Sequence, residues 1–317
     1  MSKQDLLLIA PIFPHTVSQL ESAYNLHRYW ESKDKPALLA SLKDTCVAAA
    51  TSGSSGITAT EIKALPKLKI VSCFGVGYDG VDTAACKAAG VKVTNTPDVL
   101  NECVADTSMM LVLSTVRRAV FNDRFVRDGK WLKGNAPLTD KVWGETLGIV
   151  GLGRIGKAIA KRAEGFGMKI VYHGRTKQAG VPYEYFVDLK QMAKAVRVLL
   201  LILPGGKATA NLINADVLAA LGKKGYLINV SRGSNVDEAA LLKALQDGSI
   251  AGAGLDVFVD EPRMSEEFFK LDNVVLQPHV GSGTVHTRTA MGQCVVDNLA
   301  AWFAGKPLLT EVPETRG

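Results

Sequence analysis

Cysteine is scarce in this chain, and long apolar runs are missing. The 317 residues include five cysteines, an odd number, and no two of them form a CxxC pair. That pattern argues against a disulfide framework and against a cysteine-based metal site, so we expect free thiols, no metal and a cytoplasmic location. The apolar run Leu6–Ala10 is too short for a signal peptide, and no run approaches the roughly 18 residues of a membrane span. We therefore expect no membrane partner.

Concentrated positive charge is also missing, although the chain carries a formal net charge of +6. The basic residues stand in short scattered pairs, such as Lys33 with Lys35 and Lys223 with Lys224. No basic run is interleaved with aromatic residues, as a nucleic-acid-binding stripe requires, so we expect no nucleic-acid partner. The excess charge is typical of a solvated surface. A second interpretation is that part of it serves a polyanionic cofactor.

The residues that are present alternate between short apolar runs and longer helical segments. The length and the 47% hydrophobic content suit about two domains of ordinary size. Several apolar runs are continuous, as in parallel strands that are buried on both faces. The pattern predicts an α/β fold with two doubly wound, Rossmann-like parallel sheets. The expected strands are 6–10, 69–73, 92–95, 146–150, 169–172, 198–202, 226–230, 254–258 and 274–277.

Two longer helical stretches frame the second set of strands. The amphipathic stretch Leu100–Val126 precedes that set, and Thr284–Phe303 follows it. Shorter helices are expected at Gly156–Phe166 and Glu238–Gln246, whereas Thr51–Gly56 is expected to be a loop. No linker rich in proline, glycine or serine separates the two sets of strands. We therefore expect two domains that connect through helices, with the active site in a cleft between them.

The motif Gly151-Leu152-Gly153-Arg154-Ile155-Gly156 follows the expected strand 146–150 and opens a helix. A lone GxGxxG is a weak signal, but a strand before it and a helix after it are the context of a dinucleotide-binding turn. The first glycine permits the tight turn, the second lets the backbone approach a pyrophosphate, and the third allows the helix to pack on the strand. Backbone N–H groups at the helix N-terminus would then attract the diphosphate.

The next expected strand ends without the acid that usually binds the ribose hydroxyls of NAD. It reads Tyr172-His173-Gly174-Arg175-Thr176-Lys177, and Arg175 follows Gly156 by 19 residues, where the acid is expected. An arginine at this place can bind a 2′-phosphate through two hydrogen bonds. The sequence therefore favours NADP as the cofactor, with NAD as the alternative.

Three later strands are each followed by a side chain suited to catalysis. Arg232, Glu261 and His279 come after the expected strands 226–230, 254–258 and 274–277. Ligands of open α/β sheets bind at the carboxyl ends of the strands, so these three side chains could converge. An imidazolium can protonate a ketone oxygen as hydride reaches the carbon, and a carboxylate on the other ring nitrogen favours that charged form. An arginine can bind a substrate carboxylate and polarise a 2-oxo group.

With these segments in place, the sequence resembles the D-isomer-specific 2-hydroxyacid dehydrogenase family. Within it the chain is most similar to the glyoxylate/hydroxypyruvate and hydroxyphenylpyruvate reductases. The segments that carry the resemblance are Phe74–Asp82, Asn95–Pro97, Gly151–Gly156, Asn229–Gly233, Gly252–Phe258 and Pro278–Thr284. The family fold implies a substrate-binding domain of residues 1–97 and 287–317, a dinucleotide-binding domain of residues 98–286, and a homodimer.

The resemblance also implies roles for single residues. Arg232 would bind substrate, Glu261 would pair with the histidine, and His279 would be the acid and base. The substrate would further contact the Val76 and Gly77 amides, His279 and Ser282. The residues implied to contact the cofactor are Gly151, Leu152, Gly153, Arg154, Ile155, Gly156, Gly174, Arg175, Thr176, Leu203, Pro204, Val230, Ser231, Arg232, Asp256, His279 and Gly281. Asp256 would face the nicotinamide carboxamide, and Leu203 and Pro204 would border the adenine.

The expected activity is an NADPH-dependent reduction of a small 2-oxo acid, of the glyoxylate, hydroxypyruvate or arylpyruvate type, to a D-2-hydroxy acid. The alternative is a regulatory protein that senses nicotinamide nucleotides on the same fold. A related dehydrogenase acting on phosphoglycerate or formate is a third interpretation. Two segments depart from the family pattern, Ala195-Val196-Arg197 and Pro204-Gly205-Gly206, and both are expected near the adenine.

Overall fold

The computed structural model describes residues 3–316, which fold into two compact units. The first unit comprises the described residues up to Leu100 together with those from Thr284 onward, and the second is Asn101–Gly283. We expected the division at 97/98 and 286/287. Among residues 3–316, no helix combines the length and the apolar character that crossing a membrane demands.

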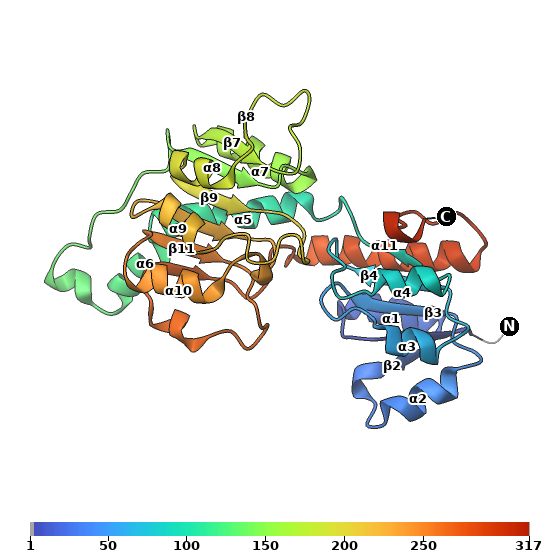
Figure 1. The fold of residues 1–317 in the computed structure, drawn as a ribbon. Helices are drawn as coiled ribbons and strands as arrows, with labels where there is room; N and C mark the ends of the chain where they lie inside the picture. The colour runs from blue at the N-terminus through green and yellow to red at the C-terminus, as the bar shows by residue number, and fades with distance from the viewer. Residues whose placement is uncertain (1–2, 317) are drawn as a thin grey trace. The chain divides into compact units, whose positions relative to one another are not determined.

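The first unit is built on a parallel sheet of five strands in the order β2-β1-β3-β4-β5. The helix α11 packs against β4 and α1 in this unit (Figure 1). An order of 2-1-3-4-5 is that of a flavodoxin-like doubly wound sheet. The strands are β1 Asp5–Leu8, β2 Asn25–Arg28, β3 Ala48–Ser52, β4 Ile70–Phe74 and β5 Lys92–Thr94. The helices are α1 Pro14–Ala23, α2 Lys35–Leu42, α3 Ala59–Ala64, α4 Thr83–Ala88 and α11 Val285–Phe303.

The second unit is built on a parallel sheet of seven strands in the order β12-β11-β10-β9-β6-β7-β8. This order contains the arrangement of a dinucleotide-binding sheet, with the switch point between β6 and β9. The strands are β6 Thr146–Val150, β7 Lys169–His173, β8 Glu184–Phe186, β9 Val198–Leu201, β10 Tyr226–Asn229, β11 Gly252–Leu255 and β12 Val274–Leu276. The helices are α5 Asn101–Val116, α6 Ala119–Arg127, α7 Arg154–Gly165, α8 Leu189–Ala195, α9 Ala215–Leu221 and α10 Glu238–Gln246.

The two faces of the second sheet bury alternate residues of the same strands. In β9, Leu199 and Leu201 pack in a core with α8, α9 and α10, whereas Val198 and Leu200 pack in a core with α5 and α7. Successive side chains of a strand point to opposite faces, so a strand covered on both sides is apolar throughout. The continuous apolar runs of the sequence follow from this double cover, and the predicted fold class is confirmed.

The nine expected strands are all found, but three others were missed. β2 and β8 are edge strands whose side chains are partly or fully exposed, so they lack the continuous apolar run that marks a buried strand. β3 reads Ala-Ala-Ala-Thr-Ser, which is poor in the β-branched and aromatic residues of typical strands. The expected loop Thr51–Gly56 was therefore wrong at its start, because Thr51 and Ser52 pair with Cys73 and Phe74 of β4.

The stretch Leu100–Val126 was expected to be continuous, but it forms two helices. α5 ends at Val116, and Arg118 adopts a left-handed backbone conformation with φ 47° before α6 begins. Such a conformation is uncommon for a residue other than glycine, and it breaks the chain of helical hydrogen bonds. In contrast, α11 begins where the sequence indicated, because the Thr284 side chain caps it by accepting from the Thr287 N–H.

Candidate active site

The glycine-rich turn lies between β6 and α7, as the motif predicted. Gly151 has φ +101°, and a Cβ there would lie 2.2 Å from the Ile202 carbonyl oxygen. A Cβ at Gly156 would lie 2.3 Å from the Gly151 carbonyl oxygen, whereas a Cβ at Gly153 would meet open space. The first and third glycines are thus required by packing within the chain. The middle one leaves room beside the N-terminus of a helix of 12 residues, which is where a diphosphate fits.

The segment after β7 presents two cations beside this turn. Arg175, Thr176 and Lys177 are exposed, and no acid stands between His173 and Gln178. The His173 ring is turned toward β8, where its Nδ1 lies 2.9 Å from the Phe186 carbonyl oxygen. The side chains that follow the strand can therefore meet a second phosphate, and they offer no carboxylate for a ribose hydroxyl.

Buried polar groups shape the loop that carries Arg232. The Asn229 side-chain oxygen accepts from the Ser231 N–H and hydroxyl at 3.0 and 2.7 Å, and its amide donates to the Arg232 carbonyl. Asn229 and Ser231 are 1% and 2% exposed, so these bonds are shielded from water. A Cβ at Gly233 would lie 1.9 Å from the Phe258 carbonyl carbon, so glycine is needed where the two loops meet.

Glu261 and His279 form a hydrogen-bonded pair after β11 and β12. The His279 Nδ1 lies 2.6 Å from the Glu261 Oε2, and the other carboxylate oxygen accepts from the Phe258 N–H at 3.0 Å. Burial raises the pKa of the Glu261 carboxyl, but the bonds from His279 and Phe258 and the charges of His279 and Arg232 outweigh it, so the pKa lies below its usual value. The carboxylate form therefore persists beside the ring.

Asp256 holds the turn that presents His279. Its carbonyl accepts from the His279 N–H at 2.9 Å, and its two carboxylate oxygens accept from the Val280 and Gly281 N–H groups at 2.7 and 2.8 Å. The side chain is 1% exposed, and this burial raises the pKa of the carboxyl against the effect of the two amides. Asp256 thus accepts hydrogen bonds from three consecutive backbone N–H groups, those of residues 279–281. These bonds hold His279 in a left-handed backbone conformation with φ 54°.

The sequence did not predict this role of Asp256. The sequence placed Asp256 inside an expected strand, but β11 ends one residue earlier, at Leu255. Its carboxylate accepts hydrogen bonds from the backbone of residues 280 and 281. An acidic residue directly after an apolar strand was the signal in the sequence that this position has a role. Its partners could not be predicted, because they depend on where the loop after β12 lies.

The remaining candidate residues lie where their strands end. Leu203 and Pro204 follow β9, and Ser282 follows the His279 turn in the same unit. Val76 and Gly77 belong to the first unit, in the loop after β4, where the Val76 carbonyl accepts from the Asn95 side chain at 2.9 Å. Arg232, Glu261 and His279 follow the neighbouring strands β10, β11 and β12 of the second unit. Glu261 and His279 are in direct contact, and the Arg232 charge lies close enough to lower the pKa of the Glu261 carboxyl.

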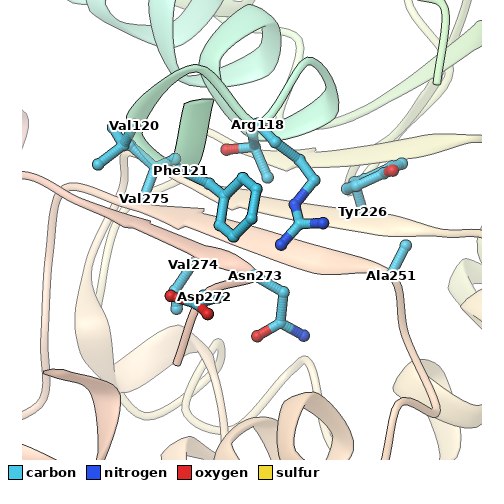
Figure 2. Close-up of a pocket in the computed structure, with 10 residues that line it drawn as sticks. Arg118, Val120, Phe121, Tyr226, Ala251, Asp272, Asn273, Val274 and Val275 are labelled. Carbon is cyan, nitrogen blue, oxygen red and sulfur yellow. The ribbon is translucent and has the colours of Figure 1, made fainter. Parts of the chain in front are cut away.

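At the other end of the same strands, where β10, β11 and β12 begin, lies a small cavity of about 30 Å³, enough for about one water molecule. Figure 2 shows the Arg118 guanidinium beside the Phe121 ring, 4.0 Å from its centroid, with Tyr226 nearby. Arg197 precedes β9 at this end and pairs with Asp140 at 2.5 Å. The expectation that Arg197 lies near the adenine was therefore wrong, because it stands at the start of the strand that Pro204 follows.

These features are those of a dehydrogenase that binds a dinucleotide: a switch-point glycine turn, and a histidine–carboxylate pair at the carboxyl ends of the same sheet. The chain belongs to the D-isomer specific 2-hydroxyacid dehydrogenase family, whose NAD-binding-domain model matches residues 109–281.

Similar proteins cover nearly the whole chain. The chain is 47% identical to the glyoxylate/hydroxypyruvate reductase A HPR2 of Arabidopsis thaliana, over 98% of this chain and 100% of that one. It is 45% identical to the hydroxyphenylpyruvate reductase of Plectranthus scutellarioides, over 97% and 98% of the two chains. Among solved structures, the NADPH-dependent glyoxylate/hydroxypyruvate reductase SmGhrB of Sinorhizobium meliloti, in complex with NADP and malonate, matches with a TM-score of 0.93. Its sequence identity is 47%, and the match covers 99% and 98% of the two chains.

Proposed function

We propose that this chain reduces small 2-oxo acids, of the glyoxylate, hydroxypyruvate or arylpyruvate type, with NADPH, and that the product is the D-2-hydroxy acid wherever C2 becomes a stereocentre. The observation that carries the proposal is the His279–Glu261 hydrogen bond of 2.6 Å, at the same sheet edge as Arg232. A histidine fixed by a carboxylate on Nδ1 keeps Nε2 for proton transfer. The relatives named as glyoxylate/hydroxypyruvate and hydroxyphenylpyruvate reductases support the substrate class.

The roles of the side chains follow from their chemistry. His279 protonates the 2-oxo oxygen from Nε2, and the Glu261 carboxylate stabilises the charged ring through Nδ1. Arg232 binds the substrate carboxylate and draws electron density from the 2-oxo group. Asp256 keeps His279 in place through the 279–281 amides. The bound nicotinamide supplies the hydride. In the first unit, we assign the Val76 and Gly77 amides to a carboxylate, as a turn-type anion nest.

The cofactor that fits the described residues is NADP. The glycine turn would hold the pyrophosphate through its backbone N–H groups, and Arg175 with Thr176 would bind the 2′-phosphate. Leu203 and Pro204 would border the adenine, and Val230, Ser231 and Gly281 would line the path to the nicotinamide. The presence of NADP in the SmGhrB structure supports this choice.

Replacing Arg175 with alanine is expected to weaken NADPH binding by about 10- to 100-fold, because a charge-assisted contact to the 2′-phosphate is lost. Binding of NADH, which lacks that phosphate, is expected to stay within about twofold by the same argument. Fluorescence titration with each cofactor measures the dissociation constants of NADPH and NADH. The control is Lys190→Ala, which removes an exposed cation of the same unit that pairs with Asp216. Equal use of NADPH and NADH by the unaltered chain would rule out the role of Arg175.

The proposed activity is tested by a substrate panel. Glyoxylate, hydroxypyruvate and an arylpyruvate are each offered with NADPH and with NADH, and absorbance of the reduced nicotinamide is followed. We expect turnover with at least one of these acids and faster turnover with NADPH. A nicotinamide-sensing regulatory protein would instead bind the cofactor and turn over none of them.

The segment after α6 supports a homodimer, which we propose as the working form. Leu132 and Leu138 are 91% and 100% exposed, and Val126, Trp131 and Trp143 are exposed nearby in the sequence. A contiguous patch of such apolar side chains would mark a protein interface. We expect a dimer in sedimentation velocity and a monomer for the double variant Leu132→Asp, Leu138→Asp. A monomeric unaltered chain would contradict the proposal, as would a variant that still dimerises.

A cytoplasmic location is proposed on the basis of the thiols. Among residues 3–316, none of the five cysteines forms a disulfide with another. Burial raises the pKa of the Cys46 and Cys86 thiols to about 11, which keeps them protonated and unreactive. Cysteines that form no disulfide are typical of proteins kept in a reducing compartment.

A further inference from the structure

Gln178 connects three parts of the second unit. Its backbone N–H donates to the Tyr172 hydroxyl at 2.8 Å, and its side-chain Nε2 donates to the Leu152 carbonyl oxygen at 2.6 Å. Tyr172 lies in β7, whereas Leu152 lies in the glycine-rich turn after β6. One half-buried residue thus ties the end of the Arg175–Lys177 segment to the sheet and to the glycine turn.

The beginning of the same segment is held by a second tyrosine. The Tyr185 hydroxyl donates to the Gly174 carbonyl at 2.9 Å. Tyr172 and Tyr185 are register partners in β7 and β8, and their ring centroids are 5.2 Å apart. Tyr172 is 1% exposed, so its hydroxyl is a fixed point of the core. The exposed side chains between Gly174 and Gln178 therefore project from a segment that is anchored at both ends.

The two segments that Gln178 joins would hold different phosphates of one ligand. In the proposed function, on which this inference rests, the glycine turn meets the pyrophosphate and Arg175 meets the 2′-phosphate. A single ribose separates those groups, so their spacing in the ligand is narrowly limited. A protein that presents both sites at a preset spacing loses less conformational freedom on binding.

We propose that Gln178 is a positioning residue for the 2′-phosphate. It does so by fixing the Arg175–Lys177 segment relative to the glycine turn, through the bond to the Leu152 carbonyl. Without that bond the segment can move away from the turn while the turn itself stays in place, since Gly151 and Gly156 are held by close packing on Ile202 and on each other. Loss of this hydrogen bond should therefore weaken the binding of ligands that carry the 2′-phosphate.

The test is Gln178→Met, which keeps the length of the side chain and the backbone N–H but cannot donate to Leu152. NADP⁺ and NAD⁺ are titrated into the full chain by calorimetry, without substrate, so that no turnover contributes. NADP⁺ is expected to bind about three- to tenfold more weakly, as for one lost hydrogen bond, and NAD⁺ to stay within about twofold. Tyr185→Phe frees the other end of the segment and is expected to give the same selective loss.

The matched control is Tyr183→Phe, whose hydroxyl donates to Glu164 at 3.0 Å and has no bond to residues 174–178. Tyr183→Phe is expected to leave the affinities for NADP⁺ and NAD⁺ unchanged. Thermal unfolding is measured to check that each variant is folded. An equal loss for both nucleotides, or no loss for either, would overturn the role of Gln178. If the unaltered chain shows no preference for NADP⁺, the proposed cofactor fails and the inference fails with it. A preference that persists unchanged in Gln178→Met removes the inference alone.

Discussion

Replacing His279 with asparagine is expected to lower kcat by about 10³-fold while leaving NADPH binding within about twofold, as is typical when a general acid is removed. Asparagine keeps a side chain of similar reach that can still hydrogen-bond Glu261, but it cannot deliver a proton near neutral pH. Hydride transfer to the 2-oxo carbon then leaves the developing alkoxide without its donor. The measurement is kcat from NADPH oxidation, together with the NADPH dissociation constant from fluorescence.

The control for that variant is His15→Asn, an exposed histidine in α1 that we assign to no site. Its kcat is expected to match that of the unaltered chain. Activity retained in His279→Asn would mean that the proton donor lies elsewhere. A loss of cofactor binding as large as the loss of kcat would mean that the residue supports the nucleotide site rather than the proton transfer.

Arg232→Gln is expected to lower kcat/KM by about 10³-fold, because one side chain supplies both the substrate contact and the polarisation of the 2-oxo group. Arg232→Lys should recover little of this, since an ammonium group cannot bind a carboxylate through two parallel hydrogen bonds. The Arg232 carbonyl would still accept from Asn229, so the loop is expected to keep its shape. Steady-state kinetics with hydroxypyruvate separates the effect on KM from the effect on kcat.

Arg263→Gln provides the matched control for Arg232. Arg263 pairs with Asp260 close to Glu261 in the sequence, and its side chain is 84% exposed. Because that ion pair is open to water, its removal is expected to change neither KM nor kcat. A defect in Arg263→Gln equal to that in Arg232→Gln would point to a general effect of charge near the site rather than to a substrate contact.

The site residues that sequence patterns predicted are those fixed by strand ends and by local turns. Arg232, Glu261 and His279 follow three parallel strands, and parallel strands bring their carboxyl ends to one edge of a sheet whatever the details of packing. The glycine turn was predictable for the same reason, since Gly151 and Gly156 meet requirements set within a few residues of each other and of the next strand.

The contacts that sequence patterns did not predict join segments far apart in the chain. Asp256 binds amides 24 and 25 residues away, and Gln178 binds a carbonyl 26 residues away. No periodic pattern in the sequence marks these separations, because each contact depends on where a loop lies after folding. The missed strand β3 has a different cause: its three alanines are buried in the sheet, but alanine is not typical of strands.

The product formed from hydroxypyruvate and NADPH tests the proposed reduction most directly. Chiral chromatography of the reaction mixture identifies the glycerate, and absorbance gives the NADPH consumed. We expect D-glycerate in a one-to-one ratio with the oxidised cofactor, and none from His279→Asn on the same timescale. L-glycerate, or NADPH consumption without glycerate, would contradict the proposed reduction to a D-2-hydroxy acid.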